Sequence, residues 1–205
     1  MITLFWCPQT RASRILWLLE EMNEPFEVRM IDIRDPEAKG DSDFVAASPM
    51  GKVPAIMDTT PNGVVQMADS ASIGLYLADR YPASGLAPAI DDPSRGQYLY
   101  WMTYTPGVIE PAMMERFNNW EVSPTTSGWG NFKQMVEVLE KGLEGGQWLL
   151  GEQFSAADVM VGSSVYFMQQ FGILPDNPVL GAYAERCLAR PAYKKALAQD
   201  AELPT

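Results

Sequence analysis

The chain has 205 residues, enough for one large domain or for two small ones that each bury a core. Its 26 acidic and 15 basic side chains give a formal net charge of −11, which disfavours nucleic acids and anionic membrane surfaces as partners. The sequence contains no histidine, which excludes imidazole bases, Ser-His and Cys-His nucleophile pairs, and HExxH zinc sites.

The sequence also indicates where the protein works. No apolar run approaches the roughly 18 residues of a membrane span, and the opening MITLFWCPQTR lacks the pattern of a signal peptide. Cys7 and Cys187 fit no metal-binding or disulfide-framework spacing, as is typical of a reducing compartment. We therefore expect a soluble, cytoplasmic protein without a metal ion.

The first part of the chain predicts a β-α-β unit. Residues 2–6 (ITLFW) form a short apolar run typical of a strand. Apolar side chains then recur at the spacing of one helix face, at Ile15, Leu18, Leu19 and Met22. The sequence NEP ends this helix, and residues 26–33 predict a second strand, parallel to the first.

A hairpin and another helix complete this region. After a polar stretch at residues 34–47, residues 53–58 and 64–68 predict two antiparallel strands joined by a turn containing PNG. A helix is expected within DSASIGLYLADRYP, residues 69–82. A β-α-β unit followed by β-β-α is the thioredoxin-like arrangement, which we assign to residues 1–82.

The rest of the chain predicts only helices. Residues 83–93 form a linker rich in Pro, Ala and Asp, and residues 94–205 show no strand pattern. The predicted helices lie near residues 94–120, 131–144, 156–171, 178–189 and 191–200. Ser155 and Asp158 have the spacing of a capping box, to which we assign a folding role. The expected fold is α+β: a thioredoxin-like domain with a mixed sheet, followed by an all-helical domain.

Three sequence strings, in order and on matching elements, carry a family resemblance. They are SPMGKVPAIMD at residues 48–58, ADSASIGLYLADRYP at residues 68–82 and GEQFSAADVMVGS at residues 151–163. With the order of the elements, they make the chain resemble the cytosolic glutathione S-transferase family over essentially its whole length. The segment TLFWCPQTRASRILWLLEE is most similar to bacterial members related to the theta, beta and nu classes. The resemblance implies an enzyme that uses glutathione as co-substrate.

Pro54 cannot donate a hydrogen bond to a strand ladder, so its place at the start of a strand needs a reason. The resemblance implies a cis peptide bond before it, which exposes the N–H and C=O of Val53 to an extended peptide. The cysteinyl portion of glutathione would bind there, although a purely structural bend is an alternative. Lys52 would meet the glycyl carboxylate, or is simply a solvated lysine.

Asp69 and Ser70 are expected to bind the γ-glutamyl group. Ser70 stands where a helix begins, so its hydroxyl and the following N–H groups suit a carboxylate, while Asp69 suits the ammonium. An ordinary N-cap role for Ser70 is the alternative. The family usually carries glutamate at the position of Asp69, so this shorter acid reaches one methylene less far.

The resemblance assigns the chemistry to CPQTRASR, residues 7–14. Thr10 falls where theta-like members carry their catalytic serine, and its hydroxyl would donate a hydrogen bond to the glutathione sulfur. Such a bond contributes about 1.5–3 kcal/mol, which would lower the thiol pKa by roughly one to two units. Ser13 is a second candidate, with capping or packing as its alternative role.

Two neighbours of Thr10, Arg11 and Cys7, could also act near the sulfur. Arg11 stands about where some beta-class members carry a cysteine, so their mixed-disulfide chemistry is not transferred to it; it could supply positive charge near the sulfur. Cys7 lies three residues before Thr10 and imitates a C-x-x-C spacing. Its alternatives are a buried thiol at the end of a strand and a reactive group.

A pocket for the second substrate is expected between Thr10 and the helix that follows the linker. The side chains predicted to line it are Trp6 from the first domain and, on one helical face, Tyr98, Trp101, Met102 and Thr105. The same spacing is typical of a buried core, and both readings stay open.

The sequence thus predicts a glutathione S-transferase that stabilises the glutathione thiolate for attack on a hydrophobic electrophile, a detoxification reaction. By the same resemblance, a homodimer is expected, with Asp69 near the interface. Two alternatives stay open. One is a glutathione-dependent disulfide reductase or peroxidase, and the other is a non-catalytic scaffold of the same fold that binds proteins.

Overall fold

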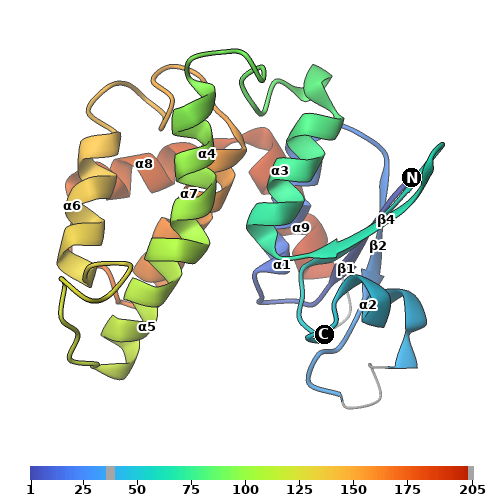
Figure 1. Cartoon of the computed structure of the whole chain (residues 1–205), viewed down its shortest axis with the longest axis horizontal. Helices are drawn as coiled ribbons and strands as arrows, with labels where there is room; N and C mark the ends of the chain where they lie inside the picture. The colour runs from blue at the N-terminus through green and yellow to red at the C-terminus, as the bar shows by residue number, and fades with distance from the viewer. Residues whose placement is uncertain (36–39, 203–205) are drawn as a thin grey trace. The chain divides into compact units, whose positions relative to one another are not determined.

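A computed structural model describes residues 1–35 and 40–202 (Figure 1). The chain forms two compact units: Met1–Ser84 together with Arg190–Thr205, and Gly85–Ala189. The first unit contains a four-stranded mixed sheet, and the described residues of the second unit contain helices and no strand. This confirms the predicted α+β fold. Residues 203–205, at the end of the predicted helical domain, lie outside the described residues.

The sheet has the strand order β2-β1-β3-β4. Its strands are β1 (Ile2–Trp6), β2 (Phe26–Met30), β3 (Ala55–Thr60) and β4 (Gly63–Ala68). As predicted, β1 and β2 are parallel, whereas β3 and β4 form an antiparallel hairpin. All five residues of the central strand β1 are buried, while the edge strands β2 and β4 are partly exposed.

The pairing register brings three chain segments to one edge of the sheet. Phe5 lies opposite Ala55, and Ala55 lies opposite Ala68. The end of β1, the start of β3 and the end of β4 therefore lie side by side. The next residues along the chain beyond this edge are Cys7, Pro54 and Asp69.

The helices α1 (Ala12–Met22), α3 (Ser70–Arg80) and α9 (Pro191–Glu202) lie together on one side of the sheet, and α2 (Ser42–Ala47) lies on the other (Figure 1). The sequence did not predict α2, which falls in the stretch taken only as polar. A short 3₁₀ helix, η2 (Pro82–Ser84), follows α3.

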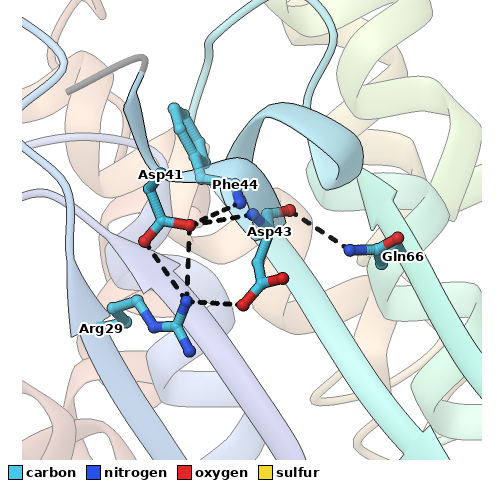
Figure 2. Close-up of polar contacts among 5 residues, drawn as sticks. All are labelled: Arg29, Asp41, Asp43, Phe44 and Gln66. Atoms are coloured by element: carbon cyan, nitrogen blue, oxygen red, sulfur yellow. Dashed lines mark hydrogen bonds and ion pairs between the residues drawn. The ribbon is translucent and has the colours of Figure 1, made fainter. Parts of the chain in front are cut away.

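Charged side chains hold α2 in place, as Figure 2 shows. The Oδ1 atom of Asp41 accepts hydrogen bonds from the N–H groups of Asp43 and Phe44, both at 3.0 Å, and so caps the helix. Arg29 of β2 forms ion pairs with Asp41 at 3.3 Å and with Asp43 at 3.0 Å. The hydrogen bond from the Phe44 N–H lowers the pKa of Asp41 most, and the hydrogen bond and charge of Arg29 lower it further. On the other flank, Gln66 of β4 donates to the Asp43 C=O at 3.4 Å.

The last helix, α9, packs against α1 through nearly buried carboxylates. Glu21 accepts two hydrogen bonds from Arg190 at 2.6 and 2.7 Å, and Glu20 pairs with Lys195 at 2.5 Å. The two glutamate side chains are only 4% and 7% exposed, so they require these partners. The helix therefore packs with the first unit, whereas the sequence predicted it as the end of the helical domain.

The second unit consists of helices joined by loops. They are α4 (Arg95–Tyr104), the π-helix η3 (Thr105–Ile109), α5 (Glu110–Asn118), α6 (Phe132–Gly142), α7 (Ala156–Gln170) and α8 (Pro178–Ala189). The continuous helix predicted at 94–120 is thus interrupted by η3, where the Glu110 N–H donates to the Thr105 C=O. Pro106 lies within η3 and Pro111 in the first turn of α5, and neither has an N–H to donate.

Across residues 1–35 and 40–202, no helix is long and apolar enough to cross a membrane. The same residues contain no cluster of three or more acidic or cysteine side chains suited to a metal ion.

The predicted capping box at the start of α7 is confirmed. Asp158 accepts hydrogen bonds from the Ser155 N–H at 2.9 Å and from the Ser155 hydroxyl at 3.1 Å. It also accepts from the Leu149 N–H and the Tyr183 hydroxyl, both at 3.0 Å. Its complete burial raises the carboxyl pKa to about 6, against the opposing effect of these hydrogen bonds.

We expect Asp158 to make stability depend on pH. Its folded pKa of about 6 lies above the unfolded value of about 3.9, so between these values only the folded state retains the proton. Its contribution to stability is therefore complete below pH 4 and is lost as the pH rises through 6, by on the order of 2–3 kcal/mol. Urea unfolding of the wild type and Asp158→Asn at pH 4.5 and 7.5 measures this. The wild type should lose stability relative to the variant at the higher pH; the same difference at both pH values would contradict the assignment.

Candidate functional site

The site residues predicted in the first unit gather at one edge of its sheet. They are Thr10 and Ser13 after β1, Lys52, Val53 and Pro54 before β3, and Asp69 and Ser70 after β4. The register described above makes these three segments neighbours, although they are separated by about forty and fifteen residues in sequence.

The segment before β3 presents peptide groups at this edge. The Val53–Pro54 peptide bond is cis, as the resemblance implied. Within the described part of the chain, the N–H and C=O of Val53 make no hydrogen bond. Pro54 itself is buried. Val53 can therefore pair with an extended peptide laid along it.

Ser48 fixes the loop that leads to Val53, and sequence reasoning missed it. Its hydroxyl accepts from the Lys52 N–H at 2.9 Å and donates to the Lys52 C=O at 2.7 Å. Ser48 is only 2% exposed, but in the sequence it looks like any loop serine. The Lys52 side chain is exposed, and its ammonium has no ion pair among residues 1–35 and 40–202. That leaves it available to an anionic ligand.

The helix α3 begins at Ser70, as predicted, but its N-cap is Asp69, so the alternative reading of Ser70 as an ordinary N-cap is wrong. The Oδ1 atom of Asp69 accepts from the N–H groups of Ala71 at 3.0 Å and Ser72 at 3.5 Å. Asp69 has a φ of 77°, a strained conformation for a residue other than glycine, of a kind that often occurs at functional sites. A hydroxyl on Ser70 is therefore not needed to cap the helix.

Ser70 is the first residue of α3 and is 6% exposed. Its hydroxyl has no hydrogen-bond partner in the part of the chain that the structure describes. The second carboxylate oxygen of Asp69 likewise accepts no hydrogen bond there. At the start of α3, the Ser70 hydroxyl and the helix dipole can therefore bind a carboxylate. Beside them, the free oxygen of Asp69 can accept a hydrogen bond from an ammonium.

Thr10 lies in the loop between β1 and α1, where local hydrogen bonds hold it. Its hydroxyl donates to the Cys7 C=O at 2.7 Å and accepts from the Ala12 N–H at 3.2 Å. Donation to a ligand sulfur would require the hydroxyl to turn away from Cys7. The Cys7 thiol is 1% exposed, which favours the reading of Cys7 as a buried residue at the end of a strand.

Ser13, the second hydroxyl candidate, points to a partner that the sequence did not reveal. Its Oγ donates to the Oδ1 atom of Asp200 in α9 at 3.0 Å. Burial raises the pKa of Asp200, while the bond from Ser13 opposes this. No local pattern could have found Asp200, because the two residues are 187 positions apart.

The side chains predicted to line a pocket are all buried. Trp6, Tyr98, Met102 and Thr105 are 0% exposed, and Trp101 is 2% exposed. Trp101 packs so closely on α6 that a Cβ added at Gly142 would lie 2.3 Å from its ring. For Trp101 the core reading is therefore favoured, and the lining role of all five stays a prediction.

Comparisons with known proteins support the assignment suggested by this geometry. The glutathione S-transferase N-terminal domain family matches residues 6–80, and the glutathione S-transferase C-terminal domain family matches residues 87–186. Among its relatives, the disulfide-bond oxidoreductase YfcG of Escherichia coli is 29% identical over 96% of this chain and 94% of its own. Glutathione S-transferase 3 of Schizosaccharomyces pombe is 26% identical over 83% of this chain and 75% of its own.

Solved structures agree with these matches. A sphingomonad glutathione S-transferase in complex with glutathione has a TM-score of 0.77 and 27% identity, and the match covers 98% of this chain and all of that one. A glutathione transferase from Methylococcus capsulatus has the same TM-score and identity over 99% of this chain and all of its own. With both of its units matched in order, the chain belongs to the glutathione S-transferase family.

Proposed function

We propose that the protein is a glutathione transferase that stabilises the thiolate of bound glutathione for attack on a hydrophobic electrophile. The observation that carries this proposal is the set of unused polar groups at the sheet edge: the Val53 peptide groups and the Ser70 hydroxyl. They suit the two ends of one short peptide, because backbone pairing and a helix start recognise different parts of it. The sphingomonad structure, a relative with glutathione bound, supports the same ligand.

In this proposal each part of glutathione has a partner in the first unit. The cysteinyl portion pairs with Val53, and the γ-glutamyl carboxylate binds the Ser70 hydroxyl at the start of α3. The γ-glutamyl ammonium binds Asp69, and the glycyl carboxylate binds the ammonium of Lys52. The exposed charges of Asp69 and Lys52 have the signs that a zwitterionic ligand needs.

The chemical step needs a thiolate and an electrophilic carbon. The sulfur forms a bond to that carbon, and the leaving group departs with its bonding electrons; the thiol proton goes to solvent. Thr10 would stabilise the thiolate by donating its hydroxyl proton, after that hydroxyl turns from Cys7. Ser13 is less suited, because its proton is bonded to Asp200. Binding both reactants in one place adds a gain from proximity.

A second candidate function is glutathione-dependent disulfide reduction, and the similarity to YfcG favours it. The same bound thiolate would attack a sulfur atom of a disulfide and displace a thiolate, giving a mixed disulfide that a second glutathione resolves. Reduction of a peroxide is the related possibility. A scaffold without activity has no observation of its own in its favour, and failure to bind immobilised glutathione would be needed to support it.

We further propose a cytoplasmic homodimer. Apolar side chains are exposed on α4 and on the edge strand β4, with Leu99 40%, Tyr100 48% and Val64 57% exposed. Surfaces of this kind suit burial against a second copy in a closed two-fold pair. Asp69 would lie near that interface.

Thr10→Ala should raise the pKa of the bound glutathione thiol by about one to two units, because the thiolate loses a hydrogen bond from a hydroxyl. Absorbance titration of the thiolate in the complex measures this. Thr10→Ser, which keeps the hydroxyl, is the matched control and should stay near the wild type. An unchanged pKa in Thr10→Ala removes Thr10 from the mechanism.

The two candidate activities can be separated by substrate. Purified protein with glutathione is expected to conjugate aryl halides or epoxides, because the proposed thiolate attacks carbon. Activity with a small disulfide but none with these electrophiles would instead establish the second candidate. Cys7→Ser should leave either activity intact, since the Cys7 thiol is buried.

Light scattering should give a mass near twice 22.7 kDa at micromolar concentrations. Val64→Asp and Leu99→Asp are expected to shift the equilibrium toward monomer, because each would bury a charge in the interface. Gln97→Glu, at an exposed polar position on α4, is a control. A monomer mass for the wild type over this range would overturn the homodimer.

A further inference from the structure

The last helix brings one carboxylate to the loop that carries Thr10. Asp200 accepts a hydrogen bond from the Ser13 hydroxyl at 3.0 Å. Asp200 therefore joins the last helix to the first turn of α1.

The Ser13 contact is one step from Thr10. The Ser13 N–H donates to the Thr10 C=O at 3.2 Å. The Thr10 hydroxyl in turn donates to the Cys7 C=O at 2.7 Å. A group that holds Ser13 therefore restrains the backbone of Thr10, and so the position of its hydroxyl.

Other contacts hold α9 in place independently of this loop. Arg190 pairs with Glu21, and Lys195 and Gln199 both bind Glu20, with the Gln199 bond at 2.7 Å. Arg190 directly precedes α9, and Lys195 and Gln199 lie on the part of α9 before Asp200. The helix is thus a fixed support from which the Asp200 side chain reaches the loop.

From this geometry we propose that Asp200 is a positioning residue for the proposed thiolate-stabilising hydroxyl of Thr10. It acts through Ser13 and not by direct contact with the reacting atoms. The proposal rests on the proposed function of Thr10. Asp200, near the end of the chain, would thus contribute to the pKa of the bound glutathione thiol.

The first test needs no glutathione. Hydrogen exchange at the amides of Ala12 and Ser13 reports whether the loop is held, since both amides bond to Thr10. Asp200→Ala and Ser13→Ala should each speed this exchange about fivefold, as expected for one lost hydrogen bond. The double variant should add nothing further, because both changes remove the same bond.

Gln199→Ala is the matched control, since it removes a contact of α9 with α1 away from the loop. It should lower overall stability without changing exchange at Ala12 and Ser13. If it speeds exchange as much as Asp200→Ala does, the effect belongs to helix docking in general, and the proposal is wrong.

The second test is the thiol pKa of bound glutathione. Asp200→Ala should raise it by about 0.5–1 unit, part of what one hydroxyl hydrogen bond can supply. Asp200→Asn retains an oxygen that accepts the hydrogen bond from Ser13, so its thiol pKa should stay close to that of the wild type. If Asp200→Ala does not fold, Ser13→Ala and Asp200→Asn are compared instead. An unchanged pKa in Asp200→Ala overturns the proposal, even if exchange becomes faster. If the wild type binds no glutathione, the proposed function fails, and the exchange experiment alone decides whether Asp200 positions Thr10.

Discussion

The pairing register of β1, β3 and β4 is the constraint on which the candidate site depends. Phe5 opposite Ala55 and Ala55 opposite Ala68 bring three separate loops to one edge of the sheet. A slip of one residue would displace a loop by roughly 3.3 Å and turn every side chain of the strand to the other face. Because side chains on both faces of β1 are buried, such a slip would exchange the side chains packed on the two faces and disrupt the packing of both. The packing of the sheet therefore also fixes the geometry of the site.

At that edge, polar groups fall into two sets with different roles. One set is satisfied within the protein and shapes the backbone: the Ser48 hydroxyl around Lys52, and the Asp69 Oδ1 atom at the start of α3. The other set, the Val53 peptide groups and the Ser70 hydroxyl, has no partner among the described residues. Because no group of the described residues occupies them, the groups of the second set can bind the ligand that we propose. The first set holds the backbone that carries these binding groups.

The first unit is completed by a helix from the end of the chain. Glu20 and Glu21 on α1 are nearly buried, and carboxylates so placed are unfavourable without partners. Arg190 and Lys195 supply the opposite charges, which ties α9 to α1. The same helix carries Asp200 to Ser13, so the docking that satisfies two glutamates also places a third carboxylate beside the loop after β1.

The sequence by itself determined those features that depend on neighbouring residues. Strand and helix periods located β1 and α1, the PNG turn located the β3–β4 hairpin, and Ser155 with Asp158 marked the start of α7, because each signal lies within one turn or one element. The resemblance supplied the cis bond before Pro54. Tertiary structure added the contacts of the helix α2 with Arg29 and Gln66 on two strands, beyond its local cap at Asp41. It decided the role of Asp69 as N-cap, which depends on a backbone angle. It also decided the partner of α9 and the bond from Ser13 to Asp200. These last contacts join residues nearly the whole chain apart, and local spacing carries no information about which distant surface a helix will meet.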